Sequence, residues 1–124
     1  MGYRIVDEPT RIPVPGDKLI EEMVGRVNTG HETLSVAHMV APPGWGEPAQ
    51  TPEFLEVTVM LRGTMRVELG PAESLEVVDV KAGQTIVVEA GTRVRYANPH
   101  DEENEYWAIC VPAFSPEAAH REED

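Results

Sequence analysis

The chain has 124 residues, a net charge of −12 and one cysteine, Cys110. This length is sufficient for one domain with its own core, and a single cysteine excludes an intrachain disulfide framework. The excess of Asp and Glu repels phosphate backbones and anionic lipid, so we expect neither a nucleic-acid nor a membrane partner. The N-terminus lacks the apolar region of a signal peptide, and no apolar run approaches the ~20 residues that span a bilayer. These features predict a cytoplasmic protein.

The first part of the chain is predicted to be extended. Residues 1–17 contain three prolines and Gly16, which are too many helix breakers for a helix, with apolar side chains between them. We interpret this segment as an arm that lies against the chain's own barrel or a neighbouring subunit. Residues 18–27 have the length of a short helix, but Gly25 and the β-branched residues favour a strand.

Short apolar or alternating segments follow, separated by turns that contain Gly or Pro. They predict strands at residues 33–41, 55–61, 65–69, 75–80, 85–88, 93–97 and 106–111. The acidic run 101–105 is expected to be a solvated loop, and the acidic tail 115–124 is expected to fray or to form a short helix. Short strands at this spacing indicate an all-β sandwich or barrel.

Two segments resemble the signatures of the cupin family. In GWGEPAQTPEFLEVTVMLRG, Gly44, Glu56 and Gly63 match the first signature, while Gln50 and Pro52 stand where its two histidines belong. In GQTIVVEAGTRVRYAN, Gly83, Gly91 and Asn98 match the second signature. Its Pro and His positions hold Glu89 and Val94 instead.

This resemblance covers residues 44–98 and implies a fold and an assembly. The expected fold class is all-β, a double-stranded β-helix (jelly-roll) cupin barrel over residues 18–114, flanked by the arm 1–17 and the tail 115–124. Because small cupins usually pair, we also expect a homodimer, in which the arm or an outer sheet face is buried.

The same resemblance implies a metal site that this chain has largely lost. Metal-binding cupins hold one divalent ion with three His and one Glu, and of these ligands only Glu56 remains, with Gln50 as a weak carbonyl donor. We therefore favour no metal. If Fe, Mn, Ni, Cu or Zn binds, the expected ligands are Glu56, Gln50 and His38.

The residues that replace the metal site suggest a pocket. Strand alternation and the cupin template place a carboxylate, an amide, a hydroxyl and apolar side chains inside the barrel, with Trp107 as packing or pocket wall; the expected ligand-binding residues are Gln50, Thr58, Met60, Val94 and Trp107. Burial would raise the pKa of Glu56 toward neutrality, so Glu56 is the candidate proton-transfer residue, assisted by Tyr96 or His38. The alternatives are that Glu56 only ends a polar network and that His38 is a core-facing imidazole, hydrogen-bonded to Glu56, a backbone carbonyl or water.

Three functional hypotheses remain open. The chain is a metal-independent isomerase, cyclase or lyase that uses Glu56, a non-catalytic binding or sensing module, or a metal-dependent cupin enzyme with an altered ligand set. All three expect a small-molecule ligand or substrate in the barrel, and none expects nucleic acid.

Overall fold

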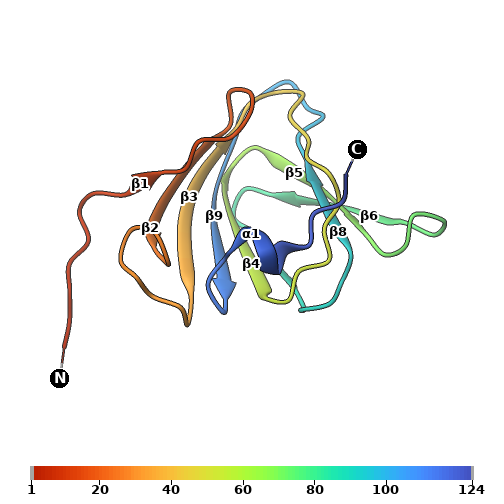
Figure 1. The fold of residues 1–124 in the computed structure, drawn as a ribbon. Coiled ribbons are helices and arrows are strands. Elements are labelled where there is room, and N and C mark those ends of the chain that lie inside the picture. The colour runs from red at the N-terminus through yellow and green to blue at the C-terminus, as the bar shows by residue number, and fades with distance from the viewer. Residues whose placement is uncertain (1, 124) are drawn as a thin grey trace.

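The computed structural model describes residues 2–123 and is built almost entirely from antiparallel strands (Figure 1). One sheet has the order β1-β2-β3-β9-β4-β7 and the other the order β6-β5-β8. The bounds of the elements are β1 Thr10–Arg11, β2 Leu19–Val24, β3 Ser35–Ala41, β4 Leu55–Arg62, β5 Thr64–Leu69, β6 Glu76–Lys81, β7 Thr85–Val88, β8 Val94–Ala97, β9 Asn104–Val111 and α1 Pro116–Ala119.

The two sheets face each other and enclose the core. In β4 the side chains alternate, so that Thr58 and Met60 are buried while Val57 and Val59 are half-buried on the other face. The core between the sheets contains two methionines and two tyrosines with smaller aliphatic side chains: Ala41, Met60, Met65, Val67, Val80, Val88, Val94, Tyr96, Tyr106 and Ala108. The all-β jelly-roll prediction is therefore confirmed.

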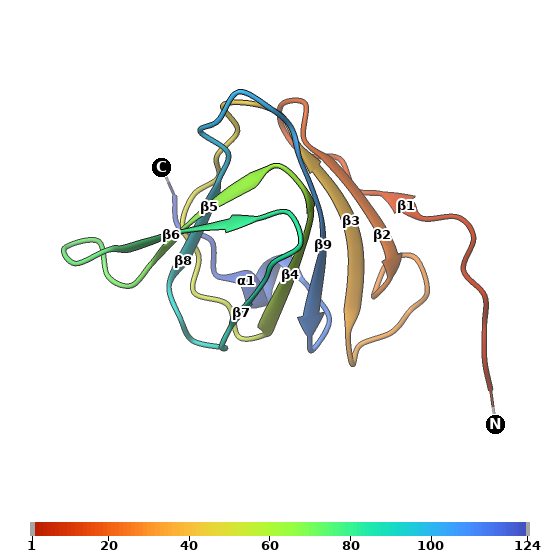
Figure 2. The ribbon, with the colours of Figure 1, turned by 180° about the vertical axis from the view of Figure 1, so that it is seen from behind.

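The ends of the chain differ in how they join this barrel. Residues 2–9 extend away from the sheets (Figures 1 and 2), and Tyr3 and Ile5 are almost fully exposed. Farther along the arm, β1 pairs with β2 and Ile12 N donates to Ile20 O at 2.9 Å. The arm is therefore part sheet edge and part free extension.

Near the C-terminus, α1 begins after Ser115, whose side chain accepts a hydrogen bond from Ala118 N. Ala119 packs with Phe54 and Cys110 in a second small core. Beyond the helix, Glu122 N donates to Ala49 O at 2.8 Å, so this end of the chain returns to the barrel. Of the two alternatives for the tail, the short helix is the one observed.

The acidic run 101–105 is only partly a loop. Asn104 and Glu105 begin β9, where Asn104 pairs with Ala41 and is fully buried. The expectation of a solvated loop is wrong at these two residues, because pairing with β3 provides hydrogen bonds that the local composition does not predict.

Asn98 holds two loops together at one end of the barrel. It is fully buried, and its Nδ2 donates to the carbonyl oxygens of Ala41 and Pro42, at 3.2 Å each, and of Glu102, at 2.8 Å. We expect Asn98→Ala to lower the free energy of unfolding by about 2 kcal/mol, because buried carbonyl groups lose their donor. Urea unfolding of the two proteins measures the difference, and unfolding curves that coincide would show that these bonds do not stabilise the loops.

Candidate functional site

Glu56 and Tyr96 meet inside the barrel from opposite sheets. Tyr96 Oη donates to Glu56 Oε1 at 3.1 Å, which joins β8 of the small sheet to β4 of the large sheet. Burial raises the pKa of Glu56 to about 7, with a smaller contribution from nearby Glu47, while the Tyr96 hydrogen bond opposes the shift. Burial also raises the pKa of Tyr96 well above its usual value. The pair is a carboxyl group that titrates near neutrality and a phenol that stays protonated.

Lys18 brings an ammonium group into the same region. It lies directly before β2, and its Nζ is 2.5 Å from Tyr106 Oη and 3.5 Å from the centroid of the Trp45 ring. Burial lowers the pKa of Lys18 to about 8, against the attraction of Glu47 and Glu56. An ammonium held against two aromatic rings is a cation–π arrangement, which offsets part of the cost of burying the charge.

Glu47 and Arg121 complete the cluster. Arg121 Nη2 lies 3.3 Å from Glu47 Oε2 and 3.4 Å from Gln50 Oε1. The residues after α1 place Arg121 here, because it forms a bridge with Gln50. Burial raises the pKa of Glu47, while Lys18 and Arg121 lower it. Two carboxyl groups and Lys18 therefore lie close together, and the guanidinium of Arg121, which is exposed, reaches them from the surface.

Four of the predicted pocket residues lie around this cluster. Gln50 is buried and exchanges backbone hydrogen bonds of 2.9 and 2.8 Å with Val94. Thr58 and Met60 follow Glu56 on the inner face of β4 and are also buried. The structure thus brings these residues together with Glu56 and Tyr96, but whether they act as a site stays a prediction.

His38 and Trp107 are elsewhere, on the outer face of the large sheet. His38 Nδ1 is 3.2 Å from Glu21 Oε1 and its Nε2 is 2.7 Å from Glu105 Oε2, and the imidazole and Trp107 rings are 5.2 Å apart. The expectation of a core-facing His38 that assists Glu56 is wrong, because β3 turns Ala37 and Ala41 inward and His38 outward. Trp107 likewise does not line the interior, since Tyr106 and Ala108 are its inward neighbours on β9.

Sequence reasoning missed Lys18, Glu47 and Arg121. The only available signal was that Lys18 is one of two lysines and directly precedes an apolar strand. Glu47 and Arg121 lie in segments without strand alternation, so no pattern indicates their direction.

The donor set does not fit a metal at Glu56. Among residues 2–123, no three His, Cys, Asp or Glu side chains are grouped so that they could hold an ion. His38 lies on the opposite face of the large sheet, and the amide oxygen of Gln50 faces Arg121. The ligand set of Glu56, Gln50 and His38 is therefore not assembled.

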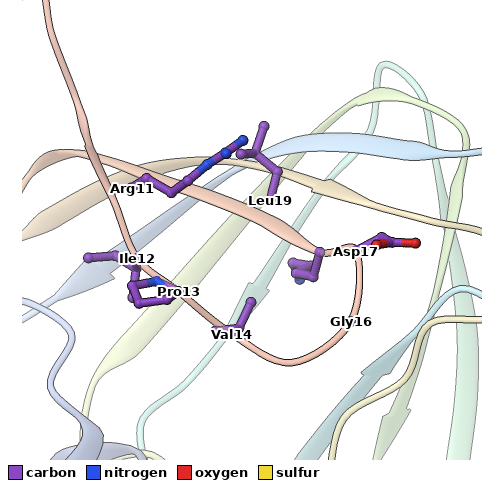
Figure 3. A pocket seen from close by; sticks show the side chains of 8 residues that line it. Arg11, Ile12, Pro13, Val14, Gly16, Asp17 and Leu19 are labelled. Atoms are coloured by element: carbon purple, nitrogen blue, oxygen red, sulfur yellow. The ribbon is translucent and has the colours of Figure 1, made fainter.

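A hollow of about 350 Å³ lies beside the arm, and one continuous segment, residues 11–19, lines it (Figure 3). Because β1 and β2 pair on either side of it, this hollow is the inside of the turn that carries Lys18 toward the barrel. No helix between residues 2 and 123 is long and apolar enough to cross a membrane.

A relative changes the functional interpretation. The chain is 45% identical over 112 residues to a protein of Myxococcus xanthus named Endoribonuclease YbeY, and the match covers 90% of this chain and 36% of that protein. This finding contradicts the expected small-molecule function in all three of its forms, and it contradicts the expectation that nucleic acid is not a partner. A net charge averages the whole surface, so it does not report what one region of that surface contacts. No family model matches the chain.

Solved structures identify the fold. An oxalate decarboxylase variant of Bacillus subtilis superposes with a TM-score of 0.76 at 18% identity, over 94% of this chain and 31% of that one. A 7S globulin of Momordica charantia superposes with a TM-score of 0.70 at 16% identity, over 88% of this chain and 33% of that one. An RmlC-like cupin of Methanocaldococcus jannaschii superposes with a TM-score of 0.64 at 18% identity, over 89% of this chain and 87% of that one. The B. subtilis enzyme is described elsewhere with Mn(II) centres, so a divalent metal is compatible with this fold. The chain is a cupin-fold protein, a double-stranded β-helix.

Proposed function

We propose that this chain is a cupin module of an RNA-processing endoribonuclease. The observation that carries the proposal is the 45% identity to a protein named an endoribonuclease, extending over 90% of this chain. Since the match spans 36% of that protein, most of the relative lies outside it. We assign RNA cleavage to that other part and a supporting role in RNA processing to the cupin module.

The chemistry of the barrel supports this division. Cleaving a phosphodiester requires donors that stabilise negative charge as it develops on the phosphate. At this cluster, Lys18 and the exposed Arg121 already face two carboxyl groups, Glu47 and Glu56, which would repel a phosphate. Tyr96, whose pKa is raised, remains protonated and bonded to Glu56. The interior is therefore better suited to stabilising the module than to cleaving RNA.

Two further parts of the proposal concern the location of the module in the cell and the position of any metal. RNA processing in bacteria takes place in the cytoplasm, so a cytoplasmic location is part of the proposal. Because the Glu56 donor set does not fit an ion, we place a divalent metal used in cleavage outside this site.

A chimaera tests the division of labour. The matched 112-residue segment of the M. xanthus relative is replaced by this chain, and cleavage of a labelled RNA is compared with that of the relative, of the relative without the segment, and of this chain alone. We expect the chimaera to cleave as the relative does, the deletion to lose about tenfold in rate, or ~1.4 kcal/mol, and this chain alone to be inactive.

Two results would contradict the proposal. A folded chimaera without activity would show that this chain does not substitute for the segment. Cleavage by this chain alone, lost on Glu56→Gln, would place the reacting groups inside the barrel instead.

A further inference from the structure

A groove crosses the outer face of the small sheet, and it adjoins the Glu56 cluster at Trp45, whose ring lies under Lys18. It has a volume of about 360 Å³, and β5, β8 and the segment before β4 form its walls. Gly46, in the segment before β4, forms a β-bridge with Ala97 and so lies along the edge of the sheet at β8. The residues that define the groove are Trp45, Gly46, Arg66, Glu68, Arg95 and Ala97.

Two arginines lie in this groove, and within residues 2–123 the Nε of one of them has no hydrogen-bond partner. Arg95 Nη1 is 3.5 Å from Glu68 Oε1, a loose ion pair. Arg66 Nε is buried and has no hydrogen-bond partner among the residues that the structure describes. The acidic residue opposite Arg66 on β6 is Asp79, and no ion pair joins the two. A buried N–H without an acceptor is destabilising, and an acceptor that reached it would offset this cost.

Gly46 keeps the floor of the groove open for Arg95. A Cβ at this position would lie 2.8 Å from Arg95 Nη2, so the guanidinium packs directly on the backbone of residue 46. Arg66 and Arg95 project from neighbouring strands, because Arg66 pairs with Ala97 and Arg95 pairs with Glu68. Two guanidinium groups can therefore reach one acceptor from the same side.

We propose that this groove binds single-stranded RNA, with Arg66 and Arg95 on a phosphate and the indole of Trp45 against a base. This inference rests on the proposed function. Planar guanidinium groups match phosphate oxygens in paired hydrogen bonds, and aromatic side chains beside a basic groove are how proteins bind single strands without reading their sequence. Trp45 is half-buried, since Lys18 lies over its ring and the side chain packs against the core, so a base would contact the part of the indole that stays exposed.

The acidic surface of the chain determines which interactions drive RNA binding. With a net charge of −12, the chain repels RNA at long range, so association depends on the local contacts in the groove, and salt weakens the phosphate contact. The groove adds the phosphate contacts that the module can bring to an endoribonuclease.

The test is fluorescence anisotropy of a labelled single-stranded oligouridine with the intact chain at low and moderate salt. The variant is Arg66→Gln with Arg95→Gln. Its control is Arg26→Gln with Arg62→Gln, two arginines that pair with Glu32 and Glu103 outside the groove. Both double variants change the net charge equally.

We expect the groove variant to bind about tenfold more weakly at low salt. We also expect the slope of log affinity against log salt concentration to become shallower by about 0.7, because the variant loses one single-strand phosphate contact. The control should bind as the wild type does. Absent wild-type binding, an unaffected groove variant, or equal losses in both variants would each overturn the groove assignment.

The chimaera separates this inference from the proposed function. If the chimaera cleaves RNA but the chain does not bind through the groove, the groove assignment fails and the proposed function stands. If the chain binds RNA through the groove but the folded chimaera is inactive, the proposed function fails.

Discussion

Gly63→Ala is expected to destabilise the barrel by about 4 kcal/mol. Gly63 links β4 to β5 with a φ of +80°, and a Cβ there would lie 2.4 Å from the carbonyl oxygen of Glu103 and 2.5 Å from Asn104 Oδ1. The carbonyl is backbone and the Asn104 side chain is fully buried, so neither can move aside easily. Alanine at this position therefore adds a close contact to the strain of a positive φ. Chemical denaturation measures the loss.

Gly83→Ala is the matched control. Gly83 also has a positive φ, +88°, but a Cβ there would meet no atom within 4 Å. We expect a loss of about 1 kcal/mol from backbone strain alone. Equal losses in the two variants would show that the contact with residues 103 and 104 does not contribute, and that both glycines are required only for their conformation.

These two glycines also show how far the sequence predicts the fold. The resemblance of residues 44–98 to the cupin signatures predicted the barrel, and the breaks at Gly and Pro located most strands of the two sheets, though not β1. A clash of an added Cβ explains the glycine at position 63 but not the one at position 83. Strand ends were missed where a distant partner decides them, as at Asn104, because pairing with β3 has no local signal.

The side chains that face the interior were predicted only in part, because alternation does not say which face of a strand is buried. Alternation placed Glu56 and Tyr96 on inner faces, and they are hydrogen-bonded. Alternation also divides β3 into two faces, but it does not say which one is inside. The face with Val36 and Val40 is the more apolar, yet it lies outward with His38, while the small residues of β3 pack inside.

Lys18 was missed because its direction depends on a turn. Residues before a strand have no period from which their side chains can be placed, and the aromatic rings that receive Lys18 come from distant segments. The balance of charge in the barrel was therefore not predictable, although it decides how the protein responds to pH.

That balance predicts a stability minimum between about pH 7 and pH 8. Glu56 has a pKa of about 7 in the folded chain against an ordinary value of 4.5, so the folded state binds more protons between these values and stability falls as pH rises through them. Lys18 has a pKa of about 8 against 10.5, so the unfolded state binds more protons above pH 8 and stability rises again.

Glu56→Gln should remove the fall in stability on the low-pH side of this minimum. We expect the stability of the variant relative to the wild type to increase by about 3 kcal/mol between pH 5 and pH 8, at ~1.4 kcal/mol per pKa unit, because the amide resembles the protonated carboxyl group and never ionises. Urea unfolding at several pH values measures the difference. Glu76→Gln, at an exposed position of β6, is the control and should show no such increase. A difference between Glu56→Gln and the wild type that stays constant with pH would mean that Glu56 ionises in the barrel as readily as in the unfolded chain, and that Lys18 and Arg121 fully compensate its burial.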